Sequence, residues 1–184
     1  MTEPASLLLD FVNTHDVGQG TDELDTPDRL AAWLAAHHLV PAGTPVGGAV
    51  GGAAELTTAI TLREGLRAAM LGHHGPDPRA LPAELDDILA GLPVRVSLGA
   101  ADRPVLLPAA GGVAGGLSGL AAAIVATAAD GTWPRLKVCQ EDGCRWAFLD
   151  TSKNRSRNWC SMRVCGNRTK TRAYRARRKS TAGQ

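Results

Sequence analysis

Aromatic residues are scarce in this 184-residue chain, and long apolar runs are missing from it. Phe, Trp and Tyr together make up 4% of the residues, so we expect a core built from aliphatic side chains. No window approaches the roughly 18 uninterrupted apolar residues of a membrane span. The start, MTEPASLLLDFVNTHD, has no basic region and meets Asp10 after three leucines, unlike a secretory signal. We therefore expect a cytoplasmic protein without a membrane partner.

Recognisable catalytic motifs are missing as well. Residues 1–134 contain no cysteine nucleophile, no HExxH metalloprotease motif, no phosphate-binding loop and no glycine fingerprint between a strand and a helix. These absences exclude the enzyme classes that depend on such motifs. We expect a protein that is not an enzyme.

Each part of the chain is poor in charge of one sign. Residues 1–134 hold 6 Lys and Arg against 15 Asp and Glu, a net charge of −9, whereas residues 135–184 hold 14 against 3, a net charge of +11. This asymmetry predicts an acidic domain over residues 1–134 and a basic domain over residues 135–184. A basic module most often binds nucleic acid and less often an anionic membrane, while a solvated basic tail is the plain alternative.

Cysteine is absent from the first 138 residues, and all four cysteines follow within 27 residues. They are Cys139, Cys144, Cys160 and Cys165, with the spacing C-x4-C-x15-C-x4-C. Reducing conditions in the cytosol keep thiols free, so clustered cysteine pairs favour a metal over disulfides. Four thiolates form a closed tetrahedral site, which predicts one structural zinc ion. A redox-active thiol cluster and a pair of disulfides are the alternatives.

The residues between the two cysteine pairs predict a small hairpin. RWAFLD, residues 145–150, is a short strand-like run, and the polar turn TSKNRSRN, residues 151–158, leads from it to Trp159. We expect Trp146, Phe148 and Trp159 to pack around the metal, because a segment of this size cannot build a large core of its own. Stacking of these rings on exposed bases is the alternative.

A basic helix is predicted behind the last cysteine, because nothing breaks a helical pattern from Asn167 to Gly183. The segment has no wide apolar face, so it cannot be a core helix, and it has no acidic residue at i±4 to neutralise it. Binding to a polyanion explains this composition best. The candidate contact residues are Asn167, Arg168, Lys170, Arg172, Arg175, Arg177, Arg178 and Lys179, with Arg155 and Arg157 in the preceding turn as a second region.

Duplex DNA is the partner that we expect for this helix. The major groove admits one α-helix, arginine pairs with guanine through two hydrogen bonds, and asparagine pairs with adenine. The sequence does not decide which residues contact bases and which contact phosphates. RNA and a membrane surface stay open as alternatives, although the helix has no apolar face to insert into lipid.

The acidic part of the chain is predicted to be mostly helical. Apolar periodicity favours helices over residues 28–39, 56–71, 82–92 and 119–129, with a low-complexity loop over residues 41–55. Alternating Val94, Val96 and Leu98 and the later PVLLPA favour one β-hairpin. The fold class is therefore α+β and mainly α: a helical N-terminal domain with a small hairpin, followed by a small treble-clef-like zinc module made of a hairpin and the basic helix.

A cluster of polar residues near the start of the chain has two readings. Asp10 and Asn13, with His15, Asp16 and the pair His73-His74, favour either a ligand pocket or a weak metal site. The same residues are equally typical of a turn and capping cluster, and adjacent histidines near Gly-Pro are typical of a solvated loop.

The string Cys165-Gly166-Asn167-Arg168, preceded by WCSM and followed by Lys170 and Arg172, closely resembles the CGNR zinc finger family. This resemblance implies a four-cysteine zinc site and a DNA-binding module of bacterial transcription regulators. LLLDFVNT, residues 7–14, resembles the start of the ABATE domain that precedes this finger in stress-induced regulators. TLREGLRAAM, with Arg63 and Arg67, resembles a later helix of that domain, and we place Arg63 with Asp10 and Asn13 in the candidate ligand pocket.

The sequence thus predicts a DNA-binding transcription regulator that is associated with the nucleoid. Its body is expected either to sense a small-molecule effector or to mediate self-association as a homodimer. An RNA-binding protein that uses the same module and a zinc/thiol redox switch are the alternatives.

Overall fold

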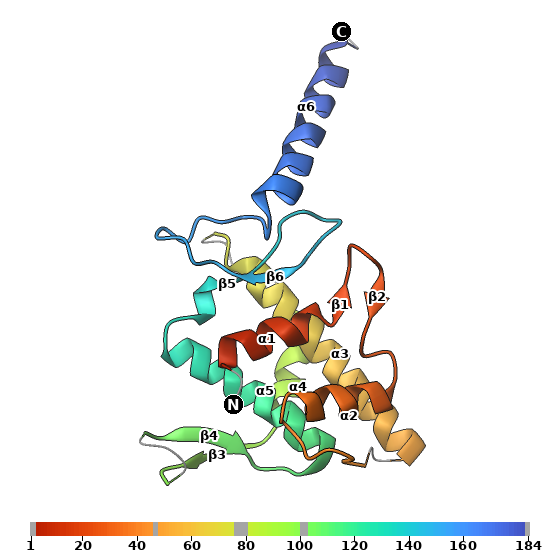
Figure 1. Cartoon of the computed structure of the whole chain (residues 1–184), viewed down its shortest axis with the longest axis vertical. Coiled ribbons are helices and arrows are strands. Elements are labelled where there is room, and N and C mark those ends of the chain that lie inside the picture. Colours follow the sequence, from red (N-terminus) through yellow and green to blue (C-terminus); the bar gives the residue numbers. More distant parts are fainter. Residues whose placement is uncertain (1–2, 46–47, 76–80, 100–102, 183–184) are drawn as a thin grey trace.

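A computed structural model of the chain describes residues 3–45, 48–75, 81–99 and 103–182. The described part is mainly helical and contains three small antiparallel two-stranded sheets, which confirms the α+β class. A helical body carries the zinc module at one end, and the last helix leads away from the body (Figure 1).

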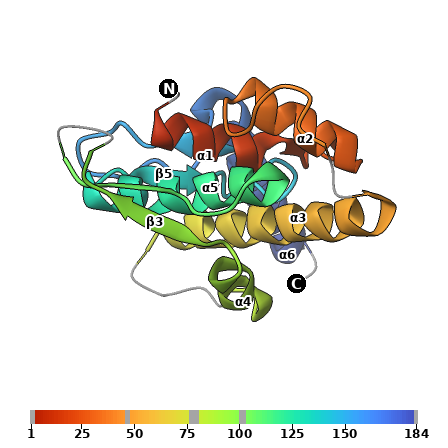
Figure 2. The ribbon, with the colours of Figure 1, turned by 90° about the horizontal axis from the view of Figure 1, so that it is seen from below.

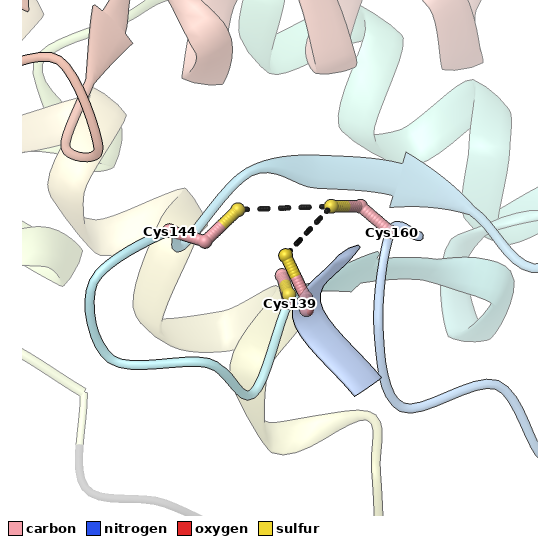
Figure 3. Close-up of side chains that lie close together, drawn as sticks. Cys139, Cys144 and Cys160 are labelled. Atoms are coloured by element: carbon pink, nitrogen blue, oxygen red, sulfur yellow. Dashed lines mark hydrogen bonds between the residues drawn. The ribbon is translucent and has the colours of Figure 1, made fainter. Parts of the chain in front are cut away.

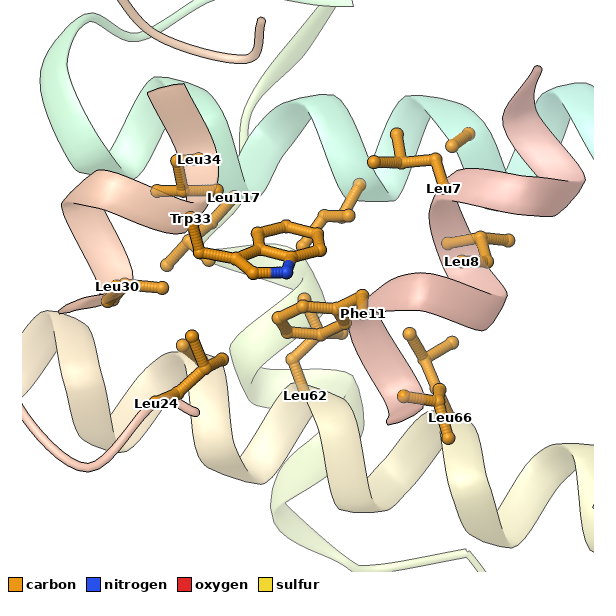
Figure 4. Close-up of a cluster of buried hydrophobic side chains, with 14 of the residues drawn as sticks. Leu7, Leu8, Phe11, Leu24, Leu30, Trp33, Leu34, Leu62, Leu66 and Leu117 are labelled. Atoms are coloured by element: carbon orange, nitrogen blue, oxygen red, sulfur yellow. The ribbon is translucent and has the colours of Figure 1, made fainter. Parts of the chain in front are cut away.

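The body is built from five helices: α1 (Pro4–Asn13), α2 (Pro27–Ala36), α3 (Gly48–Gly72), α4 (Glu84–Ala90) and α5 (Gly112–Ala129). Seen from below, α3 and α5 lie side by side, with α1 and α2 on one side and α4 on the other (Figure 2). Between α1, α2, α3 and α5 lies a largely aliphatic core in which Phe11 and Trp33 contact each other, their ring centroids 5.3 Å apart (Figure 4).

Local sequence signals set the start of α2. The Thr26 hydroxyl accepts a hydrogen bond from the backbone N–H of Arg29, and Pro27 occupies the first turn, where its missing N–H costs nothing. Leu30, Trp33 and Leu34 are buried as the periodicity predicted. The helix ends at Ala36, three residues before the expected end.

The loop predicted over residues 41–55 is wrong in its second half, because α3 already begins at Gly48. Elongation of an existing helix adds one hydrogen bond for each residue fixed, so a well-packed helix extends into a sequence that would not nucleate one. Ala53, Ala54 and Glu55 favour this extension. Glycine weakens a helix, so the composition of residues 41–55 favours a loop, and the helix forms despite it.

The predicted hairpin of the body is present. β3 (Val94–Ser97) pairs with β4 (Val105–Pro108) in antiparallel register, Val94 opposite Pro108, and β4 packs on α5. The tip of the turn, residues 100–102, lies outside the described residues. α4 occupies Glu84–Ala90, inside the predicted range of residues 82–92.

Helix α5 is longer and more apolar than expected. Among the described helices it alone has the length and hydropathy of a membrane span, with 18 residues and a mean hydropathy of 1.7. It nevertheless packs on α1 and β4, and 44% of it is buried, so it serves as a core helix of the body. Its glycines permit this packing: a Cβ on Gly116 would lie 2.9 Å from Val40 Cγ1.

The zinc module is arranged differently from the hairpin that the sequence predicted. β5 (Leu136–Val138) pairs with β6 (Ala147–Leu149), so the first two cysteines lie in the connection between these strands. The sequence predicted that residues 145–150 pair with the segment at Trp159 across the turn of residues 151–158, but in the described residues β6 pairs with β5 instead. A π-helical turn (Met162–Gly166) leads into α6 (Asn167–Ala182), the expected basic helix. The remaining elements are a 3-10 turn (Trp133–Arg135) and the short strands β1 (His15–Asp16) and β2 (Thr21–Asp22).

Candidate zinc centre and nucleic-acid interface

The four cysteine sulfurs lie close together although their residues come from the β5–β6 connection and from the segment that leads into α6. All four Sγ atoms are within 4.8 Å of one another. Figure 3 labels three of these residues, Cys139, Cys144 and Cys160. The Sγ of Cys160 is 3.6 Å from that of Cys144 and 3.8 Å from that of Cys165. Tetrahedral zinc with bonds of about 2.3 Å requires sulfurs about 3.8 Å apart. The sulfur cluster therefore fits a zinc ion.

Without a cation, the surroundings of the sulfurs favour the protonated thiols. Burial, together with the neighbouring thiols, raises the pKa of the Cys160 thiol far above its usual range and that of Cys165 to about 11. A divalent cation offsets the repulsion between adjacent thiolates, so metal binding releases the thiol protons.

Two aromatic side chains pack with the cysteines. Phe148 is 8% exposed, and it packs with Trp159 and the cysteines. Trp146, by contrast, is 39% exposed. Phe148 and Trp159 therefore pack beside the metal site as predicted, whereas Trp146 faces solvent.

The β5–β6 hairpin is joined to the body by apolar contacts and by two histidines. Leu136, Val138 and Ala147 are buried in the core of the body. His73 Nδ1 lies 2.7 Å from the carbonyl oxygen of Leu136, and His74 Nε2 lies 2.6 Å from that of Val138. Burial lowers the pKa of His73. The expectation of a solvated histidine loop is therefore wrong, because this pair holds β5.

Polar contacts from α1 and α3 complete this junction. The side-chain amide of Asn13 bonds the backbone of Ala147 twice, at 2.8 and 3.0 Å. The buried guanidinium of Arg67 donates to the carbonyl oxygens of Arg145, Val12 and His15 at 2.6–3.0 Å. The body and the first cysteine pair thus share hydrogen bonds as well as a core.

Arg63, the third candidate pocket residue, is also engaged in the body. Its buried guanidinium forms two 2.7 Å hydrogen bonds to the Asp22 carboxylate and one of 3.2 Å to the Thr14 hydroxyl. The hydrogen bond from Arg63 lowers the pKa of Asp22. Asp10 is exposed on α1. Arg63 and Asn13 have protein partners, and the ligand pocket stays a prediction.

A buried ion pair organises the turn that carries Arg155 and Arg157. Lys137 Nζ lies 2.9 Å from Asp150 Oδ2, and both side chains are at most 2% exposed. Asp150 also accepts hydrogen bonds from the Ser152 hydroxyl and from the backbone N–H groups of Ser152 and Arg157. Burial alone would raise the pKa of Asp150, but these hydrogen bonds outweigh burial and hold the pKa well below its usual range.

The two arginines of this turn differ in their surroundings. Arg155 is exposed and lies at a positive φ of 50°. The guanidinium of Arg157 lies 4.9 Å from the Phe148 ring centroid and donates to the Cys160 carbonyl oxygen at 2.8 Å. Arg157 therefore stabilises the zinc module, whereas Arg155 is available to a partner.

Most of the predicted contact residues are exposed on α6. A hollow of about 390 Å³ runs along one face, lined by Asn167, Arg168, Thr171, Arg172 and Arg175. The amide of Asn167 donates to the Arg163 carbonyl oxygen at 3.0 Å, which links α6 to the π-helical turn. Lys170 and Arg178 are exposed too, and the Arg178 guanidinium lies 5.9 Å from the Tyr174 ring centroid. The side chains of Arg177 and Lys179 lie outside the described residues.

One residue of this region was missed by the sequence analysis. Glu141 lies between Cys139 and Cys144, and its side chain is fully buried. It accepts a 2.7 Å hydrogen bond from the Thr169 hydroxyl and forms an ion pair with Arg172. The Thr169 hydrogen bond, supported by Arg172, lowers the pKa of Glu141. The absence of acidic residues at i±4 therefore does not show that every arginine of α6 lacks an ion pair. The carboxylate that neutralises Arg172 comes from the loop between Cys139 and Cys144.

Comparison with known families gives two matches that cover nearly the whole chain. Residues 5–131 match the ABATE family, described as "Putative stress-induced transcription regulator", and residues 135–178 match the CGNR zinc finger. No curated protein matches the chain. The finger match and the four clustered sulfurs together identify one structural zinc ion.

Proposed function

The chain belongs to the ABATE family and ends in a zinc-binding CGNR finger, and on this basis we propose that it is a transcription regulator that binds duplex DNA through α6. The observation that carries the proposal is the position of α6. The helix leads away from the body (Figure 1), and its described arginines and lysine are all exposed. Its 16 residues extend about 24 Å, enough to follow the major groove.

The charges of this region support a polyanionic partner. Of the exposed basic residues, Arg168 and Arg175 line one continuous face with Asn167 and Thr171. Such a surface offers donors to phosphates and to base edges together. Binding to DNA places the protein in the cytoplasm with the nucleoid, and this localisation belongs to the proposal.

Selection of the zinc-loaded full-length protein on a random duplex pool tests the proposal at about physiological salt, where weak phosphate binding is suppressed. We expect a short enriched motif. The salt slope is the change in the logarithm of the binding constant per unit change in the logarithm of the salt concentration. The variant Arg168→Gln/Arg175→Gln should lower the magnitude of this slope for duplex binding by about two, because each arginine neutralises one phosphate. Arg29→Gln on the exposed side of α2, which removes one positive charge away from α6, is the control. Unchanged binding by the double variant would refute the role of α6.

RNA binding is a second candidate because two aromatic rings face solvent. Trp146 is 39% exposed and Tyr174 is 55% exposed, and such rings can stack on unpaired bases. Competition between duplex DNA and single-stranded RNA separates the two partners. Preference for the single strand, lost in Trp146→Ala, would replace the DNA proposal.

We further propose that the body senses a small-molecule effector or mediates self-association, and that the protein has no enzymatic activity. The alternative is a redox switch in which oxidation ejects zinc. Zinc retained after mild peroxide treatment would exclude the redox switch.

A further inference from the structure

Glu141 is the residue at which the first pair of zinc ligands meets the basic helix. Its backbone carbonyl oxygen accepts hydrogen bonds from the N–H groups of Cys144 at 2.9 Å and Arg145 at 3.2 Å, which closes the turn between two ligands. Its buried carboxylate contacts Thr169 and Arg172 of α6. One residue therefore shapes the metal loop with its backbone and holds the helix with its side chain.

The two partners of Glu141 lie three residues apart on one side of α6. Side chains at i and i+3 are neighbours on a helix surface, so a contact to both restricts rotation of the helix about its own axis as well as its tilt. The Thr169 hydroxyl also lies 3.0 Å from the carbonyl oxygen of the ligand Cys165. Both cysteine pairs therefore border this contact.

The charge of Arg172 is already balanced within the protein. A buried carboxylate without a partner is strongly unfavourable, so Glu141 requires the cation that Arg172 supplies. An arginine in such a pair adds little to the net charge that attracts phosphates. Arg168 and Arg175 have no such ion pair among the described residues, although they line the same hollow.

We propose that Glu141 is a positioning residue that fixes the direction of α6 relative to the zinc site, and that Arg172 serves this contact and is not a phosphate contact. The inference rests on the proposed function and deepens it, because it divides the arginines of the helix by role. It also links the cysteine cluster to the orientation of α6 through one side chain.

Glu141→Gln and Glu84→Gln form a matched pair that separates positioning from charge. Each variant removes one negative charge, and Glu84 is exposed on α4. A charge effect alone would change specific and non-specific affinity by the same factor and would leave their ratio unchanged in each variant. We expect Glu141→Gln to lower the ratio of specific to non-specific affinity by about tenfold, comparable to one mismatched base pair. An equal ratio in both variants would overturn the proposal.

The salt dependence of binding tests the role of Arg172 separately. Arg168→Gln should reduce the salt slope by about one, as expected for a lost phosphate contact. Arg172→Gln should weaken specific binding and leave the slope unchanged. A slope reduced by about one in Arg172→Gln would make it a phosphate contact and overturn its assignment.

Hydrogen exchange gives a readout that needs no nucleic acid. In the zinc-loaded full chain, Glu141→Gln should speed amide exchange over residues 167–172 at least tenfold, and Glu84→Gln should leave it unchanged. Thr169→Val, which replaces the hydroxyl by a methyl group, should act in the same direction if Glu141→Gln loses zinc. Unchanged exchange in these variants overturns the positioning role. Faster exchange in a protein that binds no duplex would retain that role and refute the DNA proposal.

Discussion

Replacement of Lys137 by Met is expected to destabilise the zinc module strongly. Met keeps much of the length of the side chain but removes the charge that faces Asp150 Oδ2 at 2.9 Å. Loss of one partner from a buried ion pair typically costs about 3–5 kcal/mol. Asp150 keeps hydrogen bonds from Ser152 and Arg157, so we expect the lower end, about 3 kcal/mol. That loss is a large share of the usual 5–15 kcal/mol of a folded domain.

Urea unfolding of the zinc-loaded protein, followed by far-ultraviolet circular dichroism, measures this loss. For a chain of this size, about 3 kcal/mol corresponds to a Tm lower by roughly 6–12 °C. Lys153→Met is the control, because Lys153 is exposed in the same turn and should change stability by less than about 0.5 kcal/mol. If Lys137→Met unfolded within about 1 kcal/mol of the control, the buried pair would not hold this turn.

Three further predictions follow from the junction and the metal site. Arg67→Met leaves three carbonyl oxygens without their buried donor and should cost about 3 kcal/mol in urea unfolding, whereas the exposed control Arg29→Met should cost less than about 0.5 kcal/mol. The pKa of Asp22 is lowered by folding, so its contribution to stability is present above the unfolded value of about 3.8 and is lost as pH falls below it. Asp22→Asn should therefore be less stable than wild type at pH 7, and the difference should shrink towards pH 3; a constant difference would contradict this linkage. Removal of zinc by a chelator should abolish amide protection over residues 160–172 and leave residues 136–138 protected, because the body holds β5; simultaneous loss at both segments in hydrogen exchange would show that the hairpin also depends on the metal.

The metal centre was the part best predicted from the sequence. Cysteine spacing determines a zinc site because four thiolates within a short segment have few other uses in a reducing compartment. The basic helix was predicted equally well, since a charged segment without glycine or proline has one obvious regular structure. Asn167 to Ala182 form that helix.

The strand pairing of the zinc module was not predictable from local pattern. β5 has only three residues, and its centre is Lys137, which the alternation of polar and apolar residues would place in solvent. The buried lysine is favourable because its ammonium contacts the Asp150 carboxylate and the carbonyl oxygens of Arg155 and Arg157, and the contact with Asp150 spans 13 residues. Local periodicity carries no information on such contacts.

The composition of residues 135–184 nevertheless indicated that their acidic residues have structural roles. Residues 135–184 contain only three acidic residues among 14 basic ones, and two of the three, Glu141 and Asp150, are buried. A rare acid in a strongly basic segment gains most from a structural role, since abundant cations can neutralise it. Rarity within a charged segment is therefore a useful guide to buried ion pairs.

The union of the β5–β6 hairpin with the core of the body has a practical consequence for chimeric proteins. A cut between residues 134 and 135 follows the change in charge and the two family matches. It would nevertheless expose Leu136, Val138 and Ala147, which are buried in the core of the body. It would also remove the carbonyl oxygens that His73 and His74 contact. A graft of the basic helix onto another sensor would have to carry α1 and the end of α3 with it. Recombination between such genes should succeed when these segments travel together and fail when they are separated.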